Sequence, residues 1–299
     1  MFETADEILR RRGLVAYTGH ALSWDWNGFQ PGLTVYDLKG KRLEDDTKRF
    51  GPGDRLDLSV SPERRCVGSF KDDGYEPCML RQIVSGNHDQ CPQCASSWIP
   101  RQNCVFEPQC DGVHDMPCGN GGSICARPHH VYAAFYGDLI KVGMTLSSRF
   151  RERGIEQGAD AIARLGTYLN RLEARNAENA ISKALQATQW VRKTTFLKLQ
   201  GHHVDREAYQ ELLDRSLSSV AEVPTDPSPV EMLDRYPLTA VDLSQAQFAE
   251  VPNRHRGEVL GCKGKFLFYQ LRDGGVRLLD MASVPSRFII LDQGNNNKC

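Results

Sequence analysis

The chain has 299 residues, enough for two or three packed units at the usual domain size of roughly 100–200 residues. Its 37 basic and 38 acidic residues give a formal net charge of −1, so the overall charge does not attract a polyanion and any nucleic-acid surface must be a local patch. No apolar run approaches the ~20 residues of a membrane span, and the N-terminus has no signal-peptide pattern. We therefore expect a cytoplasmic protein with no membrane partner.

Residues 1–61 are predicted to form a β-rich N-terminal segment. Short apolar runs at 33–38 and 55–60 alternate with pairs of residues that contain glycine or proline. Such a pattern is typical of short strands joined by turns.

A cysteine-rich module is predicted over residues 62–128. Eight of the ten cysteines lie here, among few aliphatic side chains. A secreted protein would pair them as disulfides, whereas a reduced cytoplasmic protein uses them as thiolate ligands for metal. Without a signal peptide, metal is favoured. The module has too few apolar side chains to offset the entropy of ordering, so we expect it to need metal in order to fold.

The eight cysteines are enough for two tetrahedral zinc sites. Cys91 and Cys94 have the spacing of a zinc knuckle, and we group them with Cys66 and Cys78 around one ion. The other ion would be held by Cys104, Cys110, Cys118 and Cys125. With four protein ligands at each site and no open position, both zinc ions are predicted to be structural.

Two alternatives remain for these ligands. His88 or His114 could replace a cysteine in either set. A redox pair is the other interpretation of Cys91 and Cys94, although the strand-then-helix context of a thioredoxin-type site is missing.

Residues 129–223 are predicted to form a unit of strands and helices. Two short strands should lie within 131–145, followed by helical patterning over 147–166. A second helix is expected over 171–188, and a third over 205–220 with its first residue, an aspartate, as N-cap.

The rest of the chain is predicted to be a linker, 224–249, and a C-terminal β segment, 250–299. A turn at 272–275 should join two strands into a hairpin, and we expect the two β-rich ends of the chain to pack together. Bases and rings alternate near the start of this segment, as in single-strand stacking platforms, although core packing is the favoured interpretation. These residues are Lys263, Lys265, Phe266, Phe268 and Tyr269.

The unit at 129–223 carries a series of short motifs in a defined order. They are His130-Val131-Tyr132, then Lys141 through Thr145, then Arg149, Arg151 and Arg153, and finally Glu178. This order resembles the GIY-YIG endonuclease superfamily, whose two short motifs precede an arginine-bearing helix and a glutamate-bearing helix. Cysteine knuckles directly before such a module are similar to those of a narrower prokaryotic family. The resemblance covers roughly residues 62–190.

The resemblance implies roles for these residues. In GIY-YIG nucleases a first-motif tyrosine assists the attacking water, the helix arginine stabilises charge on the phosphate, and the glutamate holds one divalent metal ion. The corresponding residues are Tyr132, one of the three arginines with Arg153 preferred, and Glu178 with magnesium or manganese. A phosphodiester requires an activated water, cationic stabilisation and a hard oxygen ligand for the metal.

Lys141 departs from the family pattern, because the second motif usually carries a tyrosine there. A lysine neutralises phosphate as a point charge, but it replaces the proton transfer of a hydroxyl only if its pKa is lowered. We include it among the candidate catalytic residues. A nucleic-acid recognition or scaffold protein that does not cleave is therefore the alternative function, and a zinc-stabilised adaptor for other proteins is a third.

Glu178 also stands out without any resemblance, because it lies on the apolar stripe of its predicted helix with Ala174, Ile181 and Leu185. A carboxylate on such a face needs a partner. The partner could be an arginine of the preceding helix or a metal ion. Tyr132 has an equally simple alternative, as a half-buried packing residue on a strand.

Taken together, these patterns predict an α+β protein in which a two-zinc cysteine module is joined to a GIY-YIG-like unit and flanked by β-rich segments. The predicted function is binding of DNA or RNA with metal-dependent phosphodiester cleavage.

Overall fold

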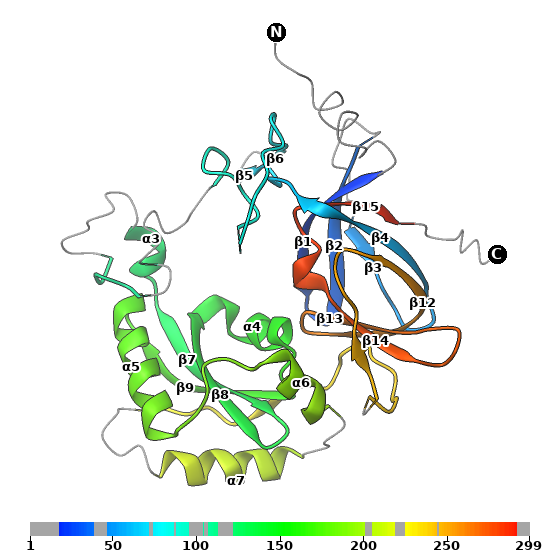
Figure 1. The fold of residues 1–299 in the computed structure, drawn as a ribbon. Coiled ribbons are helices and arrows are strands. Elements are labelled where there is room, and N and C mark those ends of the chain that lie inside the picture. Colours follow the sequence, from blue (N-terminus) through cyan, green and yellow to red (C-terminus); the bar gives the residue numbers. More distant parts are fainter. Residues whose placement is uncertain are drawn as a thin grey trace. The chain divides into compact units, whose positions relative to one another are not determined.

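The computed structural model describes residues 18–38, 47–71, 74–86, 88–95, 104, 107–112, 122–200, 205–218, 225–243 and 245–291. Their contacts divide the chain into two compact units: unit 1 contains Met1–Ser96 and Tyr236–Cys299, and unit 2 contains Ser97–Arg235 (Figure 1). Both sheets and helices are present, so the predicted α+β class is confirmed. Among the described residues, no helix has the length and apolar character needed to cross a bilayer.

Unit 1 is built on a nine-stranded sheet in the order β11-β14-β13-β12-β4-β15-β1-β2-β3. Its strands are β1 (Gly19–Asn27), β2 (Gln30–Asp37), β3 (Thr47–Arg49), β4 (Arg55–Arg64), β11 (Gln247–Phe248), β12 (Arg254–Lys263), β13 (Phe266–Gln270), β14 (Val276–Asp280) and β15 (Arg287–Leu291). A 3₁₀ turn, η2 (Met281–Ser283), precedes β15, and a separate pair consists of β5 (Ser69–Lys71) and β6 (Gly74–Glu76).

The two ends of the chain form this sheet together, as expected. Strand β4 pairs with both β12 and β15, and β1 pairs with β15. The sheet also curves back on itself, because the indole nitrogens of Trp24 and Trp26 on β1 donate to the carbonyl of Gly264 in the β12–β13 turn, at 3.2 and 2.8 Å. A continuous apolar interior results, with Leu58, Phe268 and Phe288 fully buried.

The predicted hairpin around 272–275 is confirmed, since β13 and β14 are antiparallel neighbours joined by that turn. Its aromatic residues belong to the core: Phe266, Phe268 and Tyr269 are buried, and so is Lys263. The favoured interpretation, core packing, is therefore correct and the stacking platform is not formed. A stacking platform needs rings that are open to solvent.

Unit 2 contains a four-stranded sheet in the order β10-β9-β7-β8. The strands are β7 (His129–Tyr136), β8 (Leu139–Leu146), β9 (Ala161–Tyr168) and β10 (Glu231–Met232). The helices described are α3 (Gly122–Cys125), the 3₁₀ turn η1 (Ser147–Arg149), α4 (Phe150–Gln157), α5 (Arg171–Ala184), α6 (Lys193–Leu199) and α7 (Arg206–Leu217). The short strands β10 and β11 both fall within the predicted linker 224–249.

The two faces of this sheet carry different side chains, because successive residues of a strand point to opposite sides. Val131 and Phe135 of β7 belong to an apolar cluster with Ile181 of α5. Tyr132 and the other even-numbered residues face the opposite side, where Tyr132 meets the ring of Phe150 at the start of α4, 6.3 Å between centroids. The polar site lies on this second face.

The helix predicted over 147–166 is wrong in its second half. Helix α4 ends at Gln157, where Gly158 adopts φ 73°, and residues 161–168 form strand β9. Pairing of β9 with β7 outweighs the helical propensity of its alanines, since a strand in a sheet is stabilised by its neighbours. The short helix α6 was not predicted.

The other helices agree with their predictions at the N-terminal end. Helix α5 begins at Arg171 but ends at Ala184, before the predicted 188, and Thr188 instead forms a parallel bridge with Lys141 of β8. Helix α7 follows the predicted cap, because the side chain of Asp205 accepts a hydrogen bond from the backbone N–H of Ala208 at 2.8 Å. The end predicted for this helix, near 220, lies outside the described residues.

Candidate functional site

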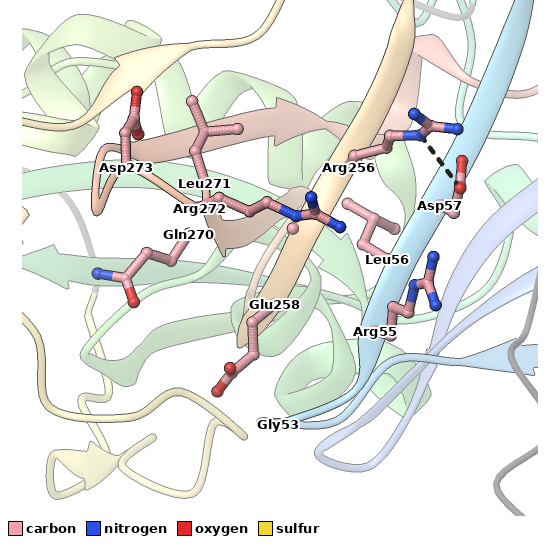
Figure 2. A pocket seen from close by; sticks show the side chains of 11 residues that line it. Gly53, Arg55, Leu56, Asp57, Arg256, Glu258, Gln270, Leu271, Arg272 and Asp273 are labelled. Atoms are coloured by element: carbon pink, nitrogen blue, oxygen red, sulfur yellow. Dashed lines mark hydrogen bonds and ion pairs between the residues drawn. The ribbon is translucent and has the colours of Figure 1, made fainter.

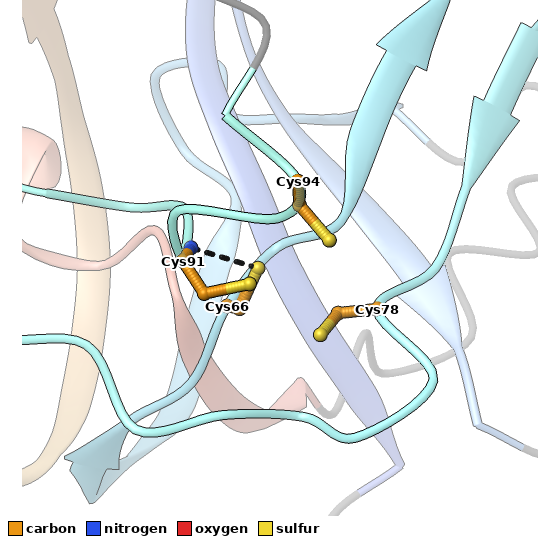
Figure 3. Close-up of side chains that lie close together, drawn as sticks. All are labelled: Cys66, Cys78, Cys91 and Cys94. Atoms are coloured by element: carbon orange, nitrogen blue, oxygen red, sulfur yellow. Dashed lines mark hydrogen bonds between the residues drawn. The ribbon is translucent and has the colours of Figure 1, made fainter.

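Four cysteines of unit 1 come together in one cluster. The sulfurs of Cys66, Cys78, Cys91 and Cys94 all lie within 4.8 Å of one another, and the first three residues are buried (Figure 3). Figure 3 shows the four side chains pointing toward one another, with Cys91 and Cys94 on one loop and Cys66 and Cys78 on other stretches of the chain. The predicted grouping of these cysteines is therefore confirmed, and the cluster could hold a metal ion.

Backbone amides support the sulfur of Cys66. The N–H groups of Gly68 and Cys91 donate to it at 3.4 and 3.2 Å. Gly68 must be glycine, because its φ is 99° and a Cβ there would lie 2.2 Å from the carbonyl oxygen of Glu76. Amide donors of this kind stabilise a thiolate and orient it toward a metal.

The cluster is held at the end of strand β4. Cys66 lies two residues after the end of that strand, and its N–H donates to the carbonyl of Gln82 at 2.8 Å. The N–H of Val84 in turn donates to the carbonyl of Arg64 at 3.1 Å. The loop that carries the cysteines is thereby fixed to the large sheet.

Burial changes the acidity of these thiols. It raises the pKa of Cys66 and of Cys94, because a thiolate is poorly solvated there and its neighbours are thiols as well. A divalent cation would reverse this effect by stabilising all four thiolates. All eight cysteines that the structure describes are free, so the disulfide alternative finds no support among them.

The second set of four cysteines is only partly described. Cys104 and Cys125 are buried and Cys110 is half-buried, while Cys118 lies outside the described residues. No second group of metal-ligating side chains occurs in the described part of the chain. His88 is described but is not a member of the cluster, and His114 lies outside the described residues.

A polar network connects the two predicted motif strands to helix α4. Lys141 Nζ donates to Gln157 Oε1 at 2.6 Å, and Gln157 Nε2 donates to the hydroxyl of Tyr132 at 3.0 Å. Gly143 lies opposite Tyr132 in the β7–β8 register, and a Cβ there would lie 2.7 Å from the tyrosine oxygen. The glycine is therefore what gives the tyrosine ring its space. Tyr132 is also fully buried, whereas its alternative interpretation expected a half-buried packing residue.

The three arginines of the 147–153 region do not all face one way: Arg149 and Arg153 share one acidic partner, whereas Arg151 has another. Arg149 pairs with Glu156, and Arg151 pairs with Glu231 of β10. Arg153 makes a longer ion pair with Glu156, at 3.3 Å, and its charge acts on both Tyr132 and Lys141. Arg153 is thus the arginine associated with the polar network.

Glu178 is buried on α5 and paired with an arginine. Arg175 Nη1 lies 2.7 Å from Glu178 Oε2, and Arg175 Nη2 lies 2.6 Å from Glu107 in the cysteine-rich segment. The partner was expected on the preceding helix, and that expectation is wrong: it is one turn earlier on the same helix, at the i,i+3 spacing. The charge of Glu178 acts on Tyr132 and on Lys141.

Burial shifts the acidity of each group in this network. Burial and the nearby charge of Arg153 together lower the pKa of Lys141 to about 8, while the charge of Glu178 opposes the change. Burial also raises the pKa of Tyr132 and of Glu178. At neutral pH the tyrosine is a hydrogen-bond donor, whereas the lysine titrates close to physiological pH.

Gln157 and Arg175 were not predicted as site residues, although simple spacing would have found them. Gln157 follows Arg153 by four positions, so both lie on one face of α4. Arg175 precedes Glu178 by three positions on α5. Neither residue type stands out on a helix by itself, because glutamine and arginine are common on solvated faces.

The chain is therefore an α+β protein with a four-cysteine cluster in one unit and a hydrogen-bonded network of Lys141, Gln157 and Tyr132 in the other. It belongs to the family described as proteins of unknown function, DUF2797, whose model matches residues 53–284. The match spans both sites. No curated protein and no solved structure matches the chain.

Proposed function

We propose that unit 2 cleaves phosphodiester bonds in nucleic acid with the help of a divalent metal ion, and that the four-cysteine cluster holds a structural zinc ion. One observation carries the first part. Tyr132, Lys141, Arg153 and Glu178 come from four different elements, yet the charges of Arg153 and Glu178 act on both of the other two side chains. Their order along the chain also follows the GIY-YIG pattern.

Lys141 supplies the base in this proposal. Its pKa of about 8 leaves a useful fraction unprotonated in mildly alkaline solution, so its Nζ can accept a proton from the attacking water. Gln157 holds that nitrogen at 2.6 Å and orients it. Lys141 thus takes the proton-transfer role of the tyrosine expected at its position.

Arg153 and Tyr132 act on the phosphate. The guanidinium of Arg153 is about half exposed and can donate to phosphate oxygens, where it offsets the negative charge of the pentacoordinate state. Tyr132 remains protonated because its pKa is raised, and it donates a hydrogen bond.

Glu178 would hold the magnesium or manganese ion. Oε2 of its carboxylate is engaged by Arg175, while Oε1 has no hydrogen-bond partner among the described residues. One carboxylate oxygen, completed by substrate phosphate and water, fits the way magnesium is bound in phosphoryl-transfer sites. The ion would supply Lewis-acid stabilisation of the phosphate.

The four thiols fit zinc better than a catalytic metal. Four sulfur ligands saturate a tetrahedral ion and leave no position for water. The amide donors to Cys66 provide the outer support that such sites need. We extend the proposal to a second structural zinc held by Cys104, Cys110, Cys118 and Cys125, which would give the protein two ions.

Substitution of Glu178 tests the catalytic proposal. Glu178→Gln should lower magnesium-dependent nicking of plasmid DNA or structured RNA by about 100-fold or more, as removal of a key electrostatic group does. Glu173→Gln is the matched control, because Glu173 lies on the same helix but is exposed and bonded to the N-cap Asn170. Wild-type cleavage by Glu178→Gln would contradict the proposal.

A recognition protein that does not cleave is the second candidate, and Lys141 in place of the usual tyrosine favours it. In that case wild-type protein binds nucleic acid with strong salt dependence but leaves it intact with magnesium or manganese. If the protein neither binds nor cleaves DNA or RNA, both nucleic-acid functions are excluded and the third candidate, a zinc-stabilised adaptor for other proteins, is favoured.

A further inference from the structure

An arginine-lined cleft lies on one face of the unit 1 sheet. Its volume is about 960 Å³, and it is formed by β4, β12, β13 and the turn that follows β13 (Figure 2). Three arginines line it: Arg55, Arg256 and Arg272. Every lining residue belongs to unit 1, whereas Tyr132 and its network belong to unit 2.

Asp57 anchors the arginine side of the cleft. Its carboxylate is buried and accepts hydrogen bonds from Arg254 at 2.9 and 3.0 Å and from Arg256 at 3.1 Å, which lower its pKa. Two guanidinium groups therefore neutralise one carboxylate. Arg256 is held by its Nε alone, so its two terminal nitrogens have no acceptor among the described residues.

Arg55 and Arg272 are not paired at all. Neither side chain makes a hydrogen bond or ion pair with any residue that the structure describes. Arg55 lies opposite Glu258 in the β4–β12 register, a position where an ion pair would be expected. Figure 2 shows Glu258 and Asp273 directed away from Arg55 and Arg256, so the acidic groups do not satisfy these arginines.

We infer that this cleft binds phosphate groups, and specifically the backbone of an oligonucleotide strand. A guanidinium presents a planar fork of N–H donors that matches phosphate oxygens, and three such groups with free donors converge on one cleft. The volume is within the range of small-ligand sites, large enough for a nucleotide. The local cluster explains how a chain of net charge −1 could bind a polyanion.

The test is binding of labelled single-stranded DNA and RNA oligonucleotides to the full-length chain, measured by fluorescence anisotropy. Arg55→Gln with Arg272→Gln should weaken binding by about tenfold or more and reduce the salt slope by about 0.7 for each phosphate that is no longer neutralised. The double variant should remain folded, since both side chains are exposed and unpaired. Circular dichroism and thermal melting check this.

Two further variants sharpen the result. Arg49→Gln with Arg206→Gln removes the same charge from exposed positions outside the cleft and should leave affinity near wild type. Arg55→Lys with Arg272→Lys keeps the charge but loses the planar fork, and should fall between wild type and the glutamine variant. Equal losses of affinity in the control pair and the cleft pair would overturn the inference, because overall charge would then explain the binding.

Inorganic phosphate and a nucleoside monophosphate form a second arm, measured by calorimetry. If they bind and the glutamine variant loses them while oligonucleotides are unaffected, the phosphate site stands but its ligand is a free nucleotide. Unchanged affinity of the glutamine variant for every probe, or no binding of any phosphate compound by the wild type, overturns the inference. Cleavage by unit 2 is scored separately with Glu178→Gln, so the two proposals fail independently.

Discussion

Lys141 is a half-buried lysine that is hydrogen-bonded to Gln157. Burial lowers its pKa from 10.5 to about 8, and Gln157 fixes its position beside Tyr132. The consequence is a nitrogen that can be either charged or neutral near physiological pH. This property decides whether the lysine can act as a base or only as a fixed positive charge.

The rate of phosphodiester cleavage should therefore rise with pH and level off above about pH 8. Lys141→Gln should lower the plateau by about 100-fold or more and remove the rise, because a general base contributes about 10²–10⁴ to the rate. Initial rates between pH 6.5 and 9.5 measure this. Full activity of Lys141→Gln would show that the lysine does not act as the general base.

The same shift has an effect on stability with a defined sign. The folded chain releases the Lys141 proton near pH 8 and the unfolded chain near 10.5, so the folded state binds fewer protons in between. Its contribution to the free energy of unfolding consequently rises between those two pH values. If the protein unfolds at alkaline pH, deprotonation of Lys141 is therefore not the cause.

His20 is a second buried titratable residue, in unit 1. Burial and the charge of Arg81 lower its pKa to about 3, and Arg81 Nη1 donates to its Nδ1 at 2.8 Å. The imidazole is therefore neutral when folded, whereas in the unfolded chain it is protonated below pH 6.5. The stability it contributes is complete above pH 6.5 and is lost as the pH falls toward 3.

Unit 1 should accordingly lose about 2 kcal/mol of stability between pH 7 and pH 5 through this one residue. His20→Asn keeps an acceptor for Arg81 but does not titrate, so its pH dependence over that range should be smaller by the same amount. Urea unfolding at both pH values provides the comparison. Identical pH dependence in the two proteins would exclude His20 as the cause.

At the level of elements, the β7–β8 pair depends on a close approach at Gly143. A Cβ at this position would lie 2.7 and 2.8 Å from the hydroxyl oxygen and Cζ of Tyr132. Tyr132 is fully buried, so its ring could not move aside without disturbing Gln157. The glycine thus controls the site through the strand pairing.

Gly143→Ala should reduce cleavage by about tenfold or more and cost about 1–3 kcal/mol of stability, as overpacking of a core does. Gly166→Ala is a suitable comparison: it is in the same sheet, and its Cβ would contact Tyr168 at 3.0 Å, a tyrosine outside the site. Similar activity losses in both variants would indicate general damage to the sheet. Rates and melting temperatures together separate the two outcomes.

Elements also show where prediction from sequence succeeded. Strands β7 and β8 and the start of α5 and α7 were predicted, because a hydrophobic period and a capping residue are local properties. Strand β9 was predicted as helix, because it contains alanines and its strand form depends on β7 as a neighbour. The hydrophobic pattern of residues 161–168 alone does not show that they pair with β7.

At the scale of the whole molecule, the four-cysteine cluster is fixed to a sheet made from both ends of the chain. Cys66 follows β4, and β4 pairs with β12 and β15 from the C-terminal segment. Loss of a metal from the cluster should therefore destabilise unit 1 as well as the loop that carries the cysteines. Metal binding and folding are coupled in such sites.

Cys94→Ala should remove one equivalent of zinc and lower the melting temperature of unit 1 by about 10 °C or more. Cys262→Ala is the control, since Cys262 is buried in unit 1 but lies outside the cluster. It should keep its metal. Elemental analysis with thermal melting gives both quantities, and purified wild-type protein without any transition metal would refute the zinc proposal.

The grouping of four of the cysteines and the α+β class followed from the sequence, because ligand type, spacing and hydrophobic period are properties of the sequence itself. Three features came only from the folded chain: the strand order of the sheet that the two ends share, the pairing of Glu178 with Arg175 and Glu107, and the arginine cleft. Each joins residues from different segments, and it is strand register and side-chain burial that bring those segments together. Contacts between residues far apart in the sequence form only when folding closes the intervening loops, so the local sequence pattern does not predict them.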